Sequence, residues 1–188
     1  YMHFESPPTP HFISAGEALY RRGDRHKKRS SIGVFDMLFV VSGRLYLMEE
    51  NQHYIIDENQ LLILSPDKIH QGYKLCDSET KFYWLHMGCA GSYYESEHLH
   101  PAKKIVNKSL FRDTMFYITL PKYIQLTEEK GKLLRSFIEP LLMFSINKYS
   151  NATEKFRTRL NPLQQQQHFL NILNLLNTDS NFSNAPDD

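Results

Sequence analysis

Short apolar segments separated by turn residues recur between positions 35 and 87, and this pattern restricts the fold more than any other feature. Strands of this length and spacing, with no helical pattern between them, are typical of β-sandwiches and β-barrels. Several segments are apolar at nearly every position, so we expect strands that are covered on both faces. The predicted strands are Phe35–Val41, Arg44–Met48, His53–Ile56, Leu61–Leu64, Ile69–Leu75 and Lys81–Met87.

After Pro121 the apolar period changes from that of a strand to that of a helix. Thr127 is a predicted N-cap, and Pro140 is expected to kink or divide the helix that follows it. Asn161-Pro162 predicts the start of a second helix. The apolar stripes of the two helices are Leu133, Leu134, Phe137, Ile138, Leu141 and Leu142, then Leu163, Phe169, Leu170, Ile172, Leu173 and Leu176.

These patterns divide the chain into four predicted parts. Residues 1–15 carry Pro7, Pro8 and Pro10 and are expected to form an irregular arm. Residues 16–120 are expected to form the barrel and residues 121–178 a helical segment. A polar break is expected between positions 147 and 159, and residues 179–188 read as a linker.

Composition excludes several classes of protein. With 22 Lys and Arg against 21 Asp and Glu, the net charge of +1 argues against a broadly basic nucleic-acid binder. Two cysteines, Cys76 and Cys89, cannot form a disulfide scaffold or a four-cysteine zinc site. The N-terminal residues lack a signal-peptide pattern, and no apolar run approaches the ~20 residues of a membrane helix. A cytoplasmic location without a membrane partner is the expectation.

Catalytic and metal-binding motifs are poorly represented. The sequence has no Gly-x-Ser-x-Gly and no glycine-rich phosphate loop. His98 and His100 have a metal-ligand spacing but stand in a polar segment, where exposed histidines are the favoured interpretation. His26 and His70 are able to face one cavity, although neither has a second ligand nearby in sequence. A basic run from Arg21 to Arg29 favours a solvated loop, with an anion- or hydroxyl-binding role for one or two of its side chains as the alternative.

The order of three segments resembles the N-terminal effector-binding domain of AraC-type bacterial transcription regulators. The segments are an apolar strand ending in Ser42-Gly43, a buried strand followed by Pro66 and His70, and the aromatic strand Phe82–Met87. Together they cover roughly residues 20 to 90. The resemblance implies a cupin-like double-stranded β-barrel (jelly roll) with an internal pocket, a helical dimerisation segment, and a following DNA-binding domain of two helix-turn-helix units. The chain is therefore expected to be the sensing half of a longer regulator.

On this resemblance, we expect a small polar effector, most simply a sugar, to bind inside the barrel. Trp84 would stack on its apolar face while Arg29 and His70 bond its polar edge. Ordinary core packing is an equal alternative for Trp84, and a structural role is slightly favoured for His70. Phe82, Trp84 and His86 share strand parity and project to one side. The expected ligand-binding residues are Arg29, Tyr46, His70, Tyr73, Phe82, Trp84 and His86.

The helical segment is expected to support a homodimer. The predicted dimerisation residues are Leu163, Phe169, Leu170, Ile172, Leu173 and Leu176. The alternative is that the Phe169 stripe packs back on its own barrel. A structural dimerisation module without a ligand is a further alternative for the whole chain.

A metal-dependent cupin enzyme, such as an isomerase or dioxygenase, is the main alternative function. Such enzymes hold a metal with two histidines and a glutamate from one motif and a histidine from a second. His70 matches the second motif, but between Gly23 and Gly43 only His26 appears. We therefore expect no catalytic residues, no metal and no cofactor.

Overall fold

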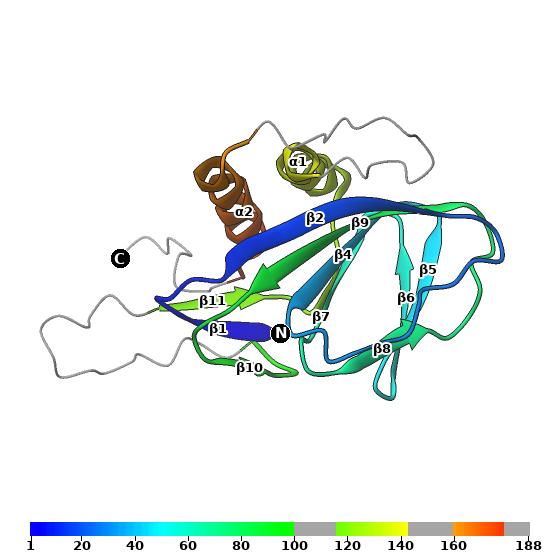
Figure 1. Cartoon of the computed structure of the whole chain (residues 1–188), viewed down its shortest axis with the longest axis horizontal. Helices are drawn as coiled ribbons and strands as arrows, with labels where there is room; N and C mark the ends of the chain where they lie inside the picture. The colour runs from blue at the N-terminus through cyan, green and yellow to red at the C-terminus, as the bar shows by residue number, and fades with distance from the viewer. Residues whose placement is uncertain (100–115, 143–159, 179–188) are drawn as a thin grey trace, which may run out of the picture.

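The computed structural model describes residues 1–99, 116–142 and 160–178, and in these residues it forms a β-barrel with two helices on one side (Figure 1). The polar segment at 147–159, the linker at 179–188 and His100 lie outside the described residues. No helix in the described residues is long and apolar enough to cross a membrane. The elements are β1 (Met2–Ser6), β2 (His11–Tyr20), β3 (Arg29–Ser30), β4 (Phe35–Ser42), β5 (Arg44–Glu49), β6 (Gln52–Asp57), β7 (Gln60–Leu64), β8 (Ile69–Gly72), β9 (Thr80–Gly88), β10 (Tyr93–Glu95), β11 (Phe116–Leu120), β12 (Tyr123–Gln125), α1 (Glu128–Ile138), a 3₁₀ turn η1 (Glu139–Leu141) and α2 (Pro162–Leu176).

Two antiparallel sheets form the barrel, and the fold is cupin-like, as the sequence predicts. The five-stranded sheet has the order β12-β7-β4-β9-β2, and the four-stranded sheet has the order β3-β8-β5-β6. The chain passes from one sheet to the other at Gly43, whose φ of 80° is accessible to glycine at little steric penalty. A third sheet of order β10-β1-β11 lies beside them.

The predicted strands agree with the structure within about two residues at most ends. The exception is β8, which was expected to extend to Leu75 and ends at Gly72. Beyond it the chain bonds to a loop instead of a strand, because the Cys76 amide donates to the Asp24 carbonyl and the Gly23 amide donates to the Cys76 carbonyl.

The expected irregular arm at residues 1–15 is wrong for most of its length. Met2–Ser6 form β1, which pairs with β10 and β11, and β2 begins at His11. Met2 and Phe4 are fully buried. The prolines lie between the two strands, where no amide is required by a ladder, so they interrupt the strands without preventing them.

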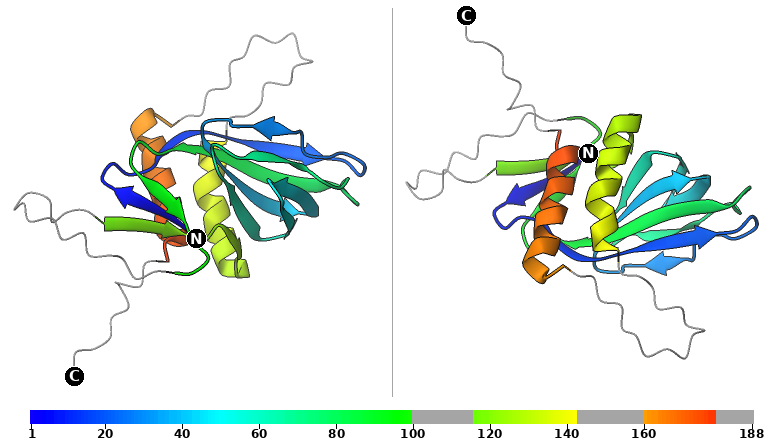
Figure 2. Two further views of the ribbon diagram at one scale, coloured as in Figure 1. Left: turned by 90° about the horizontal axis from the view of Figure 1, so that it is seen from below. Right: turned by 90° about the horizontal axis from the view of Figure 1, so that it is seen from above.

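The central strands are covered on both faces, which explains their continuous apolar sequence. In β9, Phe82 joins a small core between the two sheets, whereas Tyr83, Leu85 and Met87 join the larger core beneath the helices. Both helices cover the outer face of the five-stranded sheet and lie side by side (Figure 2). The face that carries Phe82 is therefore the inner one.

Both helices begin where the sequence predicts. The Thr127 side chain accepts a hydrogen bond from the Lys130 amide, and Asn161 forms a capping box with Gln164. α1 ends at Ile138 and Pro140 falls in η1, in agreement with the expected break.

The apolar stripe of α2 fills the core of its own chain. Phe169, Ile172, Leu173 and Leu176 are each no more than 3% exposed and pack in the same cluster as Leu134 of α1 and residues of the barrel. The dimerisation role expected for these four residues is therefore wrong, because side chains buried within the chain leave no surface for a partner. Leu163 and Leu170 are exposed, at 79% and 46%.

Candidate ligand-binding site

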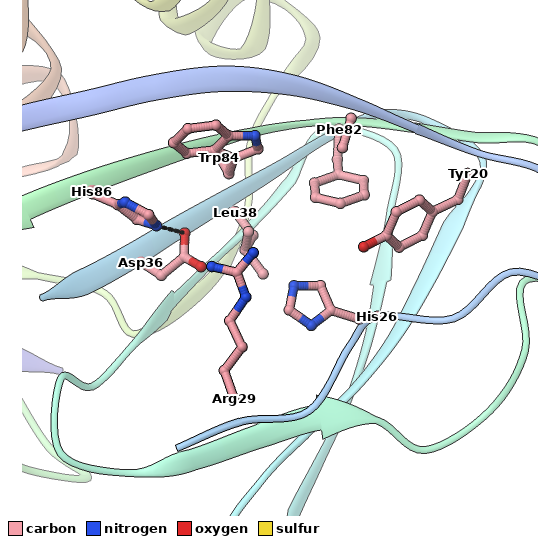
Figure 3. Close-up of a pocket in the computed structure, with 9 residues that line it drawn as sticks. Tyr20, His26, Arg29, Asp36, Leu38, Phe82, Trp84 and His86 are labelled. Carbon is pink, nitrogen blue, oxygen red and sulfur yellow. Dashed lines mark ion pairs between the residues drawn. The ribbon is translucent and has the colours of Figure 1, made fainter. Parts of the chain in front are cut away.

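A cavity of about 160 Å³ lies between the two sheets. Strands β2, β4 and β9 supply one wall, and β3 with the loop before it supplies the other (Figure 3). The volume is below the ~300–1,000 Å³ of drug-sized sites, so it suits a small molecule. Its lining residues are Ala18, Tyr20, His26, Arg29, Asp36, Leu38, Phe82, Trp84 and His86.

Strand register aligns the residues of the first wall in rows. Trp84 lies between Gly16 of β2 and Leu38 of β4, and His86 lies opposite Asp36 of β4. Because directly opposed residues of an antiparallel pair share a face, each row presents its side chains to the cavity together. The sequence expectation that Phe82, Trp84 and His86 project to one side agrees with this arrangement.

Trp84 occupies space that only a glycine leaves open. A Cβ atom built on Gly16 would lie 2.3 Å from Trp84 Cζ2 and 2.6 Å from Cε2. The indole therefore lies flat over the β2 backbone. Phe82 makes an edge contact with Tyr20 at a centroid distance of 5.0 Å, which continues the aromatic wall.

Asp36 places a buried carboxylate at the cavity. Its side chain is 3% exposed, and its Oδ1 atom is 3.7 Å from His86 Nε2, with no hydrogen-bond partner among the described residues. The Arg29 guanidinium comes from the opposite wall and points toward this carboxylate (Figure 3). A buried carboxylate oxygen without a partner is energetically unfavourable, so the site is suited to a hydroxyl, an amine or a cation.

Two buried histidines stand beside Asp36. The His26 Nδ1–H donates to the Lys27 carbonyl at 2.9 Å, which leaves the Nε2 lone pair free to accept. Neither ring nitrogen of His70 has a hydrogen-bond partner among the described residues. Burial, reinforced by the neighbouring His70, lowers the pKa of His26 to about 4, and burial also lowers the pKa of His70. Both imidazoles are therefore neutral at pH 7.

Four of the expected ligand-binding residues line the cavity: Arg29, Phe82, Trp84 and His86. His70 is opposite Arg29 in the β3–β8 pair and contacts His26 at a ring distance of 5.5 Å. Trp84 combines the two alternatives, because it packs against the small core between the sheets and also lines the cavity.

Tyr46 and Tyr73, also expected to bind the ligand, do not line this cavity. They contact each other at 5.9 Å in a separate cluster, where the Tyr46 hydroxyl donates to Asp77. The sequence reasoning assigned no role to Asp36 or Tyr20. An acidic residue inside an otherwise apolar strand was the available signal for Asp36.

The basic run from Arg21 to Arg29 is divided by its place in the fold. Its cationic side chains belong to exposed residues, as expected of a solvated loop. Arg29 differs because it also borders the cavity. The solvated-loop interpretation therefore applies to the run as a whole, and the binding role remains a candidate for Arg29.

A second, larger cavity of about 460 Å³ lies between β11 and α2, on the far side of the five-stranded sheet. Its lining includes Phe116, Ile118, Leu170 and Leu173 and is mainly apolar. It contains no charged side chain among the described residues, so it offers fewer means of orienting a polar ligand.

No family model matches the chain. A stretch of 83 residues, 44% of the chain, is 40% identical to the uncharacterized HTH-type transcriptional regulator YisR of Bacillus subtilis (strain 168). The chain is a relative of a transcriptional regulator. The match covers 29% of that regulator, so the chain spans less than a third of the relative's length.

Two solved structures align with this chain at low sequence identity. ToxT of Vibrio cholerae aligns over 93% of this chain and 61% of its own, with 11% identity and a TM-score of 0.42. A cupin protein of Bacteroides fragilis aligns over 45% of this chain and 70% of its own, with 17% identity and a TM-score of 0.35.

Proposed function

We propose that the chain is the effector-sensing part of a longer AraC-type transcription regulator, and that a small polar metabolite, most simply a sugar, binds in the cavity between the sheets. The observation that carries this proposal is the convergence of an aromatic wall with Asp36, Arg29 and His86 on one small cavity. The relationship to a transcriptional regulator supports the regulatory part.

The lining matches the two surfaces of a sugar. The flat face of Trp84 provides an apolar contact for ring C–H groups, as aromatic side chains do for other apolar surfaces. The Asp36 carboxylate accepts hydrogen bonds from hydroxyls, and the Arg29 guanidinium donates to them. A hydroxyl on Asp36 Oδ1 would supply the partner that this atom lacks within the described chain.

Strand β2 connects the cavity to the helices. Ala18 lines the cavity, and six residues earlier the Phe12 backbone is held by the side chain of Gln166 in α2. The Phe12 amide donates to Gln166 Oε1 at 2.8 Å, and Gln166 Nε2 donates to the Phe12 carbonyl at 3.0 Å. If β2 can adopt two placements, a ligand that binds more tightly to one of them would favour that placement and would shift α2 through these bonds. A ligand changes the balance between two conformations only through such a difference in affinity.

Further parts of the proposal concern the whole regulator. The regulator would act in the cytoplasm as a homodimer. Of the predicted dimerisation residues, Leu163 and Leu170 of α2 are exposed and would form the dimer contact. A separate helix-turn-helix domain would contact DNA. We propose no catalytic role, because the cavity chemistry is accounted for by binding.

The test is a thermal-shift screen of the chain against neutral monosaccharides, polyols and short carboxylic acids. A ligand at about 100 times its Kd stabilises the folded state by roughly 2.7 kcal/mol. We expect a sugar or polyol to raise Tm, and we expect Arg29→Ala and His86→Ala to abolish the increase. Tyr73→Ala, outside the cavity, is the matched control. A ligand whose effect survives both cavity variants would refute the site, and the absence of any stabilising compound would favour a purely structural module.

A further inference from the structure

Three side chains from three segments of the chain meet beside the cavity. His26 lies in the loop before β3, Asp36 lies in β4 and His70 lies in β8. One ligating atom of each, a ring nitrogen or a carboxylate oxygen, lies within 4.8 Å of the other two, and all three residues are buried. We propose that His26, Asp36 and His70 bind one divalent transition-metal ion. This inference goes beyond the proposed effector site, with which the cluster shares Asp36, and its test needs no effector.

The unpaired buried atoms of the cluster are better explained by a bound ion than by a purely structural role. Asp36 Oδ1 and both ring nitrogens of His70 are buried and have no hydrogen-bond partner among the described residues. Structural histidines in protein cores are normally hydrogen-bonded, because an unpaired buried polar atom costs about 1–3 kcal/mol. A cation would satisfy the carboxylate and both imidazoles at once.

The orientation of the His26 ring also fits a metal ion. His26 donates its Nδ1–H to the Lys27 carbonyl, which is the arrangement that fixes a metal-binding imidazole with Nε2 toward the ion. Bonds of ~2.1 Å in tetrahedral geometry place ligand atoms about 3.4 Å apart, so atoms that now lie within 4.8 Å of one another must approach by up to about 1.4 Å.

Two imidazoles and one carboxylate form a set that suits Zn²⁺ or Fe²⁺ and leaves coordination positions open. Two of the three ligands, His26 and Asp36, line the cavity, and His86 Nε2 is 3.7 Å from the Asp36 carboxylate. Arg29 is the cationic side chain that lines the cavity beside this cluster. Because Arg29 is exposed, its guanidinium has room to move away from a bound cation.

The ion would join parts of the barrel that are otherwise in separate sheets. Asp36 belongs to the five-stranded sheet and His70 to the four-stranded sheet, while His26 anchors the basic loop. Binding should therefore stabilise the folded chain, since the three ligands come together only in the native structure.

Calorimetric titration with Zn²⁺ of the whole chain, after treatment with a chelator, tests the proposal. We expect one equivalent to bind and to raise Tm. His26→Ala, Asp36→Asn and His70→Gln should each weaken binding by more than the roughly 10- to 100-fold that second-shell changes produce. His98→Ala, an exposed histidine outside the cluster, should bind as the unmodified chain does. The absence of saturable binding by the unmodified chain, or equal affinity in the three variants, would overturn the proposal.

A spectroscopic measurement guards against misfolded variants and against a cysteine site. Co²⁺ bound by the unmodified chain should show d–d absorption without the intense ultraviolet charge-transfer band of a cobalt–thiolate bond. A thiolate band would assign the ion to Cys76 or Cys89 and would overturn the proposal. The conservative Asp36→Asn and His70→Gln variants should retain the circular dichroism of the unmodified metal-free chain, so that their loss of binding reports on the ligands.

Discussion

Substitution of Gly16 by alanine tests whether Trp84 lies over β2 as part of the cavity wall. An alanine Cβ would lie 2.3 Å from Trp84 Cζ2, whereas carbon atoms in favourable contact are about 3.5–4.0 Å apart. The indole must therefore move by at least about 1.2 Å. The contacted atoms are at the far end of a side chain that borders a cavity, so we expect a destabilisation near 1 kcal/mol, the low end of the ~1–3 kcal/mol for overpacked cores.

The assay is the fluorescence of Trp84, the chain's single tryptophan, together with urea unfolding. Gly16→Ala should shift the emission maximum and change quenching by acrylamide, and it should weaken binding of any cavity ligand. Glu17→Ala is the matched control, because it is the next residue of β2 and pairs with Lys81 on the other face. Unchanged emission and quenching in Gly16→Ala would show that the indole does not lie on Gly16.

Three further predictions concern stability. Phe169→Ala should destabilise the chain by about 3–5 kcal/mol in urea without changing its sedimentation, because the ring is fully buried within the chain; dissociation of a dimer at unchanged stability would contradict this. Asn161→Ala should cost about 1 kcal/mol through loss of the α2 capping box, and an unchanged urea midpoint would refute that role. Burial raises the pKa of Glu95, but hydrogen bonds from Lys68, Ser65 and Lys122 hold it at about 2. The stabilisation is full above the unfolded value of ~4.3 and disappears as the pH falls toward 2. Glu95→Gln should lose about 1–2 kcal/mol at pH 7 after allowance for solvent screening, and an equal loss at pH 2.5 would refute the linkage.

Strands β4–β9 and both helices were predictable because local sequence determines them, whereas β1–β3 and β10–β12 were not predicted. The two-sided burial of β4 and β9 is visible in their continuous apolar sequence, and Asn161-Pro162 states the start of α2 directly. The strand in Met2–Ser6 was missed because nearby prolines dominated the local signal. Its pairing with β11, more than 100 residues away, is invisible to local reasoning.

The site was predictable only in part, because the register between strands determines which side chains meet in the cavity. Once β9 is recognised, the common side of Phe82, Trp84 and His86 follows from strand parity. The meeting of Asp36 with His86 depends on how β4 aligns with β9, and the meeting of His26 with His70 depends on a loop that packs across the barrel. Neither contact corresponds to a short motif in the sequence, so neither could be predicted from it. The position of Tyr46 and Tyr73 outside this cavity likewise follows from the register and not from a local pattern.

The central claim is that the cavity beside Trp84 is the ligand site, and a fluorine resonance tests it most directly. Incorporation of 5-fluorotryptophan labels this one position, so the ¹⁹F spectrum of the folded chain should contain a single line. We predict that every sugar or polyol that raises Tm also moves or broadens this line, in proportion to its occupancy. A compound that stabilises the chain but leaves the line unchanged would place the ligand elsewhere, as in the apolar cavity beside α2, and would contradict the account.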